Sequence, residues 1–137
     1  MKPDLNQTLE QLEKETWKNP GYDSYLATTI YSLRKKPLKD FSINDLRIVI
    51  GQNMGLDHLI PIAIEKLRKN LLAEGDFYPG DLLNNVLEVD ESYWKKNKKQ
   101  WQAIIELVES KRFVFESASQ HRKLKRSFER FQQINDE

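Results

Sequence analysis

The chain has 137 residues, a formal net charge of +1 at pH 7 and no cysteine. This length is that of one ordinary domain with a buried core, and the lack of cysteine excludes disulfide bonds and thiolate metal sites. No apolar run reaches the ~18 residues that a membrane-spanning helix needs, and the polar start MKPDLNQTLEQLEKE is not typical of a signal peptide, so we expect a cytosolic protein.

Two helices are predicted before residue 40. Spacings of three and four residues place apolar or small side chains on one face of each helix. These are Leu5, Leu9, Leu12 and Thr16 in the first helix, and Leu26, Ile30 and Leu33 in the second. The break Asn19-Pro20-Gly21 separates the two helices, and Asp23 or Ser24 is expected to cap the second one.

Two further helices are predicted between residues 42 and 71. Ser42 and Asp45 have the spacing of a capping box, which marks a helix start. Gly55 is expected to end this helix, and Asp57 to cap the next one, with Pro61 in its first turn. The predicted buried faces are Ile43, Leu46, Val49 and Ile50, then Ile60, Ile64, Leu67 and Leu71.

The rest of the chain is also predicted to be helical. Asp81 is expected to cap a fifth helix, and no Gly or Pro follows residue 88. The predicted buried positions of three helices are Leu82, Leu83, Val86 and Leu87, then Trp94, Trp101, Ile104, Ile105 and Val108, and finally Leu124, Phe128 and Phe131. The stretch RFVFESAS, residues 112–119, is compatible with a helix, a turn or a short strand. We therefore predict an all-α fold of about six or seven helices, in a single domain spanning residues 1–137.

The stretch EGDFYPGD, residues 74–81, combines three carboxylates, two aromatic residues and a rigid turn. Such a cluster can hold a hard cation, form a catalytic pair, meet a partner or join two helices. Its spacing does not match a calcium-binding loop. The structural interpretation explains most of its residues: Gly75 ends the preceding helix, Gly80 adopts positive φ, and Phe77 and Tyr78 pin the turn to the core. We therefore predict no metal site, and a helix connection that leaves acids free for a partner.

The sequence contains no pattern that predicts catalysis. His58 and His121 have no nucleophile or carboxylate partner at a local spacing, and no phosphate-binding loop or zinc helix motif is present. The basic segments at residues 95–99 and 121–126 are compatible with nucleic-acid binding, although a solvated helix face is the preferred interpretation. We therefore expect no enzyme activity and no cofactor.

Charge is distributed unevenly along the chain. Residues 1–92 carry 11 basic and 15 acidic groups, whereas residues 93–137 carry 11 basic and 6 acidic groups. Six acids and no base lie between residues 72 and 92. This asymmetry creates a local negative field on a nearly neutral protein, which favours binding to another macromolecule.

Three segments of the chain resemble the immunity proteins of bacterial contact-dependent growth inhibition (CdiI-type) toxin–immunity systems. They are DSYLATTIYSLRKKPLKDFS, LRIVIGQNMGLDHLIPIAIEKL and LLAEGDFYPGDLLNNVLEVDESYW. The most specific element is EGDFYPGDLL preceded by GLxxLIPxAxExL, and the resemblance covers roughly residues 8–95. The last 40 residues carry no part of this pattern.

The resemblance implies an antitoxin rather than an enzyme. A neighbouring cell delivers the C-terminal toxin domain of a large surface protein, and the immunity protein binds the cognate toxin in the cytosol as a 1:1 heterodimer. Such toxins are frequently nucleases, and an EndoU-like RNase is the expected type. No nucleic acid, membrane or small-molecule substrate is expected as a partner. The alternative hypothesis is a helical nucleic-acid-binding module that uses the basic C-terminal helix.

The expected toxin contacts come mainly from the acidic stretch, because a carboxylate-rich surface can occupy a cationic nuclease site. Aromatic side chains are expected to anchor the centre of such an interface. The predicted partner-binding residues are Glu74, Asp76, Glu88, Asp90 and Glu91, with Tyr78 and Trp94 as aromatic anchors.

Overall fold

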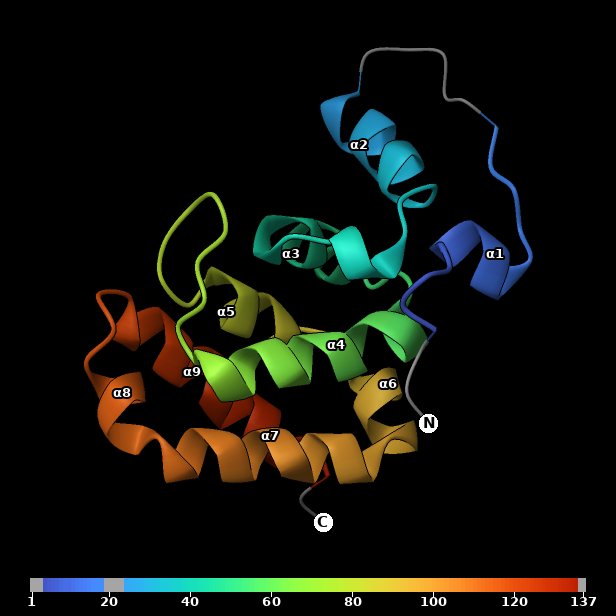
Figure 1. Ribbon diagram of the computed structural model, residues 1–137. Coiled ribbons are helices and arrows are strands. Elements are labelled where there is room, and N and C mark those ends of the chain that lie inside the picture. Colours follow the sequence, from blue (N-terminus) through green and yellow to red (C-terminus); the bar gives the residue numbers. More distant parts are fainter. Residues whose placement is uncertain (1–3, 19–23, 136–137) are drawn as a thin grey trace.

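Helices form the framework of the part of the chain that the structure describes, residues 4–18 and 24–135 of a computed structural model (Figure 1). These residues contain nine α-helices, one 3-10 helix and no strand, so the predicted all-α fold is confirmed. The elements in chain order are α1 (Leu9–Glu13), α2 (Tyr25–Leu33), η1 (Leu38–Asp40), α3 (Ile43–Gly51), α4 (Leu56–Lys69), α5 (Asp81–Leu87), α6 (Glu91–Lys96), α7 (Lys98–Ser110), α8 (Arg112–Glu116) and α9 (His121–Gln133).

The first helix is shorter than predicted. Thr8 and Gln11 form a capping box at its start, and Lys14 adopts a left-handed conformation with φ 55°, which ends α1 after Glu13. Leu5 lies before the helix and is 46% exposed, so the predicted stripe from Leu5 to Thr16 is wrong at both ends. The predicted break at residues 19–21 and the alternative cap Asp23 lie outside the described residues.

Serine side chains start α2 and α3 as predicted. Ser24 Oγ accepts the N–H of Ala27 at 3.1 Å. Ser42 Oγ accepts the N–H of Asp45, and the Asp45 carboxylate accepts the N–H of Ser42, each at 3.0 Å. Both caps satisfy backbone donors that the first helical turn leaves free, and the predicted capping box is confirmed.

The start of α4 differs from the prediction. Gly55 adopts φ 61°, but it is the N-cap of α4 rather than the end of α3. Asn53, with φ 56°, is the left-handed residue that follows α3. Asp57 consequently falls in the first turn of α4, and Pro61 falls one turn later than predicted. Pro61 removes one backbone donor there, yet the helix continues to Lys69.

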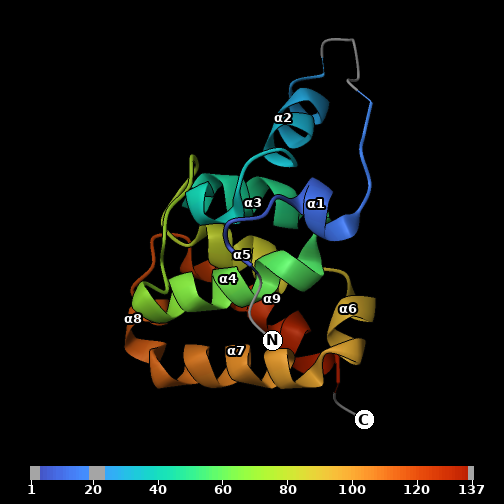
Figure 2. The ribbon, with the colours of Figure 1, turned by 45° about the vertical axis from the view of Figure 1, so that its right-hand side comes forward.

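Helix α5 lies at the centre of the packing. Six of its seven residues are buried, and it contacts α3, α4 and α9. Helix α7 packs on α4, and α2 packs on α3. Helices α2 and α7 lie at opposite ends of the structure (Figures 1 and 2). The predicted inward faces meet in one apolar cluster that includes Leu46, Val49, Ile50, Ile60, Ile64, Leu67, Leu71, Leu82, Leu83, Val86, Leu87, Ile104, Val108, Leu124, Phe128 and Phe131.

The C-terminal part contains more helices than the periodicity predicts. The segment expected to be one helix from Trp94 to Val108 is broken at Asn97, whose side-chain amide donates to Tyr93 O at 2.8 Å. Residues 112–116 of the ambiguous stretch form α8. These breaks raise the number of α-helices above the predicted six or seven. Within the described part of the chain, no helix has the length and apolar character needed to cross a membrane.

Candidate partner-binding face

The loop of residues 70–80 joins α4 to α5 and rises beside α3 (Figure 1). The two arms of the loop are joined by an isolated antiparallel bridge between Glu74 and Pro79. Gly80 N donates a further hydrogen bond to Leu72 O at 3.1 Å. Gly80 adopts φ 97°, so the predicted positive φ at this glycine is confirmed. Gly75 does not end α4, which stops at Lys69; it lies within the loop.

Asp81 closes this loop rather than capping α5. Its carboxylate is 2% exposed and accepts the N–H groups of Gly75 at 2.6 Å and Phe77 at 3.0 Å. The N-cap position belongs to Gly80, and α5 begins at Asp81 itself. The predicted helix cap is therefore wrong. The same carboxylate ties the first turn of α5 to the loop that precedes it.

A second set of polar contacts fixes the loop to α3. Asn44 donates to the Asp76 carboxylate and accepts the N–H of Asp76, each at 2.9 Å. Arg47 Nε donates to Asn44 Oδ1 at 2.8 Å and lies 3.7 Å from the buried Asp81 carboxylate. One network thus joins α3, the loop and α5. The loop is consequently held in one shape before any partner arrives.

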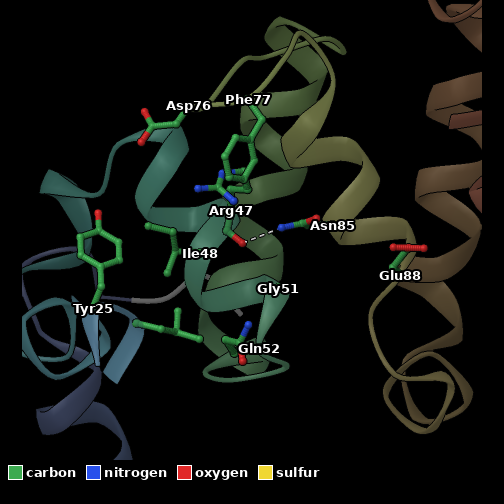
Figure 3. Close-up of a pocket in the computed structure, with 10 residues that line it drawn as sticks. Tyr25, Arg47, Ile48, Gly51, Gln52, Asp76, Phe77, Asn85 and Glu88 are labelled. Atoms are coloured by element: carbon green, nitrogen blue, oxygen red, sulfur yellow. Dashed lines mark hydrogen bonds between the residues drawn. The ribbon is translucent and has the colours of Figure 1, made fainter. Parts of the chain in front are cut away.

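Phe77 lies outside the core. Its ring is 70% exposed and lies over the Arg47 guanidinium, with 4.3 Å between the guanidinium carbon and the ring centre (Figure 3). Tyr78 is half-buried, and Lys123 Nζ lies 5.1 Å from the centre of its ring. The prediction that both aromatics pin the turn to the core is therefore wrong for Phe77, since polar contacts of Asp81 and Asn44 hold the loop.

A groove of about 520 Å³ opens beside Phe77, between α2, α3 and the C-terminal end of α5 (Figure 3). We call it the aromatic groove. Tyr25 is 76% exposed and Leu26 is 40% exposed on its α2 side. It is lined by Tyr25, Leu26, Arg47, Ile48, Gly51, Gln52, Asp76, Phe77, Asn85 and Glu88. Exposed aromatic side chains beside a depression of mixed polar and apolar lining are compatible with contact to another protein.

The predicted acidic residues separate into two groups. Asp76 and Glu88 both line the aromatic groove, whereas Asp90 lines a different depression near the start of α6. All five predicted acids are exposed: Glu74, Asp76, Glu88, Asp90 and Glu91. Glu88 is paired with Arg130 of α9 at 2.9 Å. The structure therefore places two of the predicted acids, Asp76 and Glu88, on the aromatic groove, whereas Glu74, Asp90 and Glu91 do not line it.

Trp94 does not lie on this face. Its side chain is 0% exposed and packs edge-on against Phe131, with ring centres 5.0 Å apart. A partner cannot reach it without opening the core, so the expectation of an aromatic anchor at Trp94 is wrong. The two exposed aromatics at the groove, Tyr25 and Phe77, were not identified from the sequence as contact residues. For Tyr25 a signal exists, because the stripe of Ile30 and Leu33 leaves it on the outer face of α2.

The two histidines are placed apart. His58 lies in the first turn of α4, and His121 Nδ1 lies 3.3 Å from Phe115 O at the start of α9. Among the described residues, no group of three or more metal-ligating side chains is arranged to hold an ion. The face described above consists of aromatic, acidic and amide groups on α2, α3, α5 and the loop 70–80.

The fold and this face together define an all-α protein with a hydrogen-bonded loop beside a groove of aromatic, acidic and amide side chains. A sequence model of the CDI immunity proteins matches residues 11–104, which include the loop 70–80 and every residue of the aromatic groove. The chain therefore belongs to the family of CDI immunity proteins, and the resemblance noted in its sequence is confirmed. No curated protein and no solved structure gives a significant match to the chain.

Proposed function

We propose that the chain acts in the cytosol as a non-catalytic immunity protein that binds its cognate toxin domain one-to-one and blocks the toxin's active site. The observation that carries this proposal is the family match over residues 11–104. Support comes from the pre-shaped loop 70–80 and the exposed aromatic side chains beside it. A loop fixed before binding loses little conformational freedom when a partner docks.

The proposed contact surface is the aromatic groove together with the tip of the loop. Phe77 and Tyr25 are its anchors, because large exposed aromatics contribute most binding energy once water is excluded. Asp76 and Glu88 line the groove beside them, and Glu74 is exposed on the loop. Asp90, Glu91 and Tyr78 are proposed as peripheral contacts, since none of them lines the aromatic groove, and Trp94 is removed from the set because it is buried.

The proposed toxin is a nuclease, with an EndoU-like RNase as the specific hypothesis. A nuclease site is cationic because it holds phosphate groups, and an acidic loop complements it. The whole chain carries a net charge of only +1, so charge alone is a weak basis for capture. The exposed side chains of Tyr25, Leu26 and Phe77 at the aromatic groove supply apolar contact area in addition to charge.

Co-purification tests the proposal directly. The untagged chain is expressed with the tagged C-terminal domain of the surface protein encoded beside it, and the eluate is analysed by light scattering. We expect a single species of one copy of each chain, in which the toxin domain no longer cleaves RNA. A folded, active toxin domain that elutes alone contradicts the proposal.

Substitutions at the aromatic groove test the proposed surface. Phe77→Ala is expected to weaken toxin binding by about 2 kcal/mol or more, measured by titration calorimetry. Phe113→Ala is the matched control, since Phe113 is 91% exposed on α8, outside the matched region. Equal affinities of the two variants would place the interface elsewhere.

Charge reversal at Asp90 and Glu91 tests whether these two acids contribute to toxin binding. Asp90→Lys combined with Glu91→Lys is expected to slow association at low salt, because both carboxylates are exposed and add to the negative field that attracts a cationic partner. Circular dichroism checks that the variant keeps its helical content. Unchanged binding kinetics in a folded variant would remove Asp90 and Glu91 from the proposed contacts.

The exposed cations of α9 favour the alternative function, nucleic-acid binding. They are Arg122, Lys123, Lys125 and Arg126. This alternative predicts that an RNA oligonucleotide binds at low salt and is released steeply as salt rises. Fluorescence anisotropy measures both effects, and a flat titration at low salt eliminates the alternative.

A further inference from the structure

A second groove lies on a different part of the molecule, between η1, α4 and α7. We call it the cationic groove. Its volume is about 580 Å³, and seven of its fourteen lining residues are apolar. Phe41 and Ile64 are buried in its floor, and Ala103 of α7 is half-buried beside them. It shares no lining residue with the aromatic groove, so its occupancy does not depend on the proposed toxin surface.

Positive charge surrounds this apolar floor. Five of the fourteen lining residues are cations: Lys39, Lys66, Arg68, Lys69 and Lys99. They come from three elements, η1, α4 and α7, so the charges face the groove from more than one side. A single acid, Glu65, lies among them, and it is paired with Arg68.

The lysines of this groove lack anionic partners in the part of the chain that the structure describes. No carboxylate lies within ion-pair distance of Lys39, Lys66, Lys69 or Lys99 there. Like charges held near one another repel, and a bound anion relieves this repulsion. The basic face of α9 also carries several cations, but none of them lines the cationic groove.

We infer that the cationic groove binds an anionic amphiphile, a small molecule with an apolar body and a carboxylate, sulfonate or phosphate head. Its volume lies within the range of about 300 to 1,000 Å³ that small-molecule sites occupy, and it combines an apolar lining with a few polar groups. The body of the ligand covers Phe41, Ile64 and Ala103. The head lies among the lysines of α4 and α7, where charge complementarity selects an anion.

Ligand titration of the full chain tests this inference. Anilinonaphthalene sulfonate serves as the fluorescent probe, and dodecanoate competes with it. Dodecyltrimethylammonium has the same chain with a cationic head and is the control ligand. We expect dodecanoate to displace the probe and to shift the amide NMR signals of Ile62 and Ala103, while the cationic control does neither. Lack of dodecanoate binding, or equal binding of both ligands, overturns the inference.

A paired set of variants locates the charge requirement. Lys66→Glu combined with Lys99→Glu reverses one cation on each wall of the groove, whereas Lys95→Glu combined with Lys125→Glu makes the same change of net charge elsewhere. The first pair is expected to weaken dodecanoate binding about tenfold or more, and the control pair to leave it within about twofold. Equal losses in both pairs overturn the inference, because they show a general effect of net charge.

Two further measurements keep the test decisive. If circular dichroism shows that the reversed pair does not fold, Lys66→Gln combined with Lys99→Gln replaces it, with a smaller expected loss of about threefold. Vesicles that contain an anionic phospholipid distinguish the source of the ligand. Binding to free dodecanoate alone supports a soluble amphiphile, and binding to vesicles as well supports a membrane lipid with the same head chemistry. An unaltered affinity in the Gln pair contradicts the inference.

Discussion

The loop 70–80 and the C-terminal helices α8 and α9 are held in place by different kinds of contact. The loop lies inside the region that matches the family and is fixed by a buried carboxylate, an asparagine and an arginine. Helices α8 and α9 lie outside that region, yet they fill the core with Phe115, Phe128 and Phe131.

The two kinds of contact constrain the side chains of the two regions to different degrees. A polar network needs particular side chains at particular positions, because an unpaired buried group is costly. An apolar core accepts many residues of suitable size, so its sequence pattern is weak. The loop beside the proposed toxin-binding groove is thus held by contacts for which few other side chains could substitute.

The largest expected effect is in the C-terminal core. Phe131 is fully buried, and its ring lies edge-on to Trp94 and 6.1 Å from Trp101. Phe131→Ala is expected to lower the free energy of unfolding by about 3 to 5 kcal/mol, because it leaves a cavity that its neighbours cannot fill. Urea unfolding followed by circular dichroism measures this change.

Phe113→Ala is the control for this substitution. Phe113 is 91% exposed, so its removal is expected to change the free energy of unfolding by about 0.5 kcal/mol or less. A small effect at Phe131 would show that α9 is not part of the cooperative core. The contrast between the two regions would then be one of stability as well as contact type.

The next largest effect is in the loop. Asp81→Ala removes the acceptor of the Gly75 and Phe77 N–H groups and leaves Arg47 without its buried partner. We expect a loss of about 2 to 3 kcal/mol in the free energy of unfolding, together with faster amide exchange at Gly75 and Phe77. Amide exchange in α9 is expected to become faster only to the extent that the free energy of unfolding of the whole protein falls.

Asp76→Ala provides the comparison for Asp81. Asp76 is exposed and bonds only to Asn44 among the described residues, so a loss below about 1 kcal/mol is expected. If both aspartates gave the same small loss, the buried carboxylate would not be what holds the loop. Hydrogen exchange would then identify the contacts that do.

The third effect is a pH dependence of the free energy of unfolding, which we expect from Tyr93 of α6. Burial raises the pKa of Tyr93 to about 12, with the charge of Asp57 as a second cause. The folded state therefore holds this proton more tightly than the unfolded chain, whose tyrosine pKa is about 10. The contribution of Tyr93 to the free energy of unfolding is fully present below about pH 10. It falls by roughly 2 to 3 kcal/mol as the pH rises through about 12.

Tyr93→Phe isolates this contribution. The variant lacks the hydroxyl that donates to Gln100, so it is less stable at pH 8 but loses less stability between pH 10 and 12. Denaturant unfolding at several pH values measures the slope. Parallel slopes for the two proteins would show that Tyr93 does not titrate differently in the folded state.

Local signals in the sequence predicted much of the fold. The Ser42–Asp45 capping box, the Ser24 cap and the positive φ of Gly80 each depend on neighbours within a few residues, and all three are confirmed. The apolar stripes of α3, α4, α5 and α9 were also correct, because helical spacing alone places them on one face.

The errors lie where distant residues decide the outcome. Asp81 is the first residue of α5 and accepts the loop N–H groups of Gly75 and Phe77 instead of capping the helix. Trp94 is buried because Phe131, far along the chain, covers it. Phe77 is exposed, and its ring contacts the guanidinium of Arg47 in α3 rather than the apolar core. Local spacing in the sequence does not predict these contacts between distant residues.

The smallest expected effect lies where the two regions touch. Gly80 has φ 97°, and a Cβ added there would approach the Leu124 side chain of α9 to 3.0 Å and that of Leu72 to 3.3 Å. Gly80→Ala is therefore expected to lower the free energy of unfolding by about 1 to 2 kcal/mol, partly from backbone strain and partly from this contact.

A double-mutant cycle with Leu124→Ala divides these two contributions. If the contact with α9 matters, Gly80→Ala is less destabilising in the Leu124→Ala background, because the shortened side chain leaves room for the new methyl group. An equal loss in both backgrounds assigns the effect to the backbone alone, which means that the loop keeps its shape without help from α9. No loss in either background contradicts the left-handed conformation at Gly80 as a requirement of the loop.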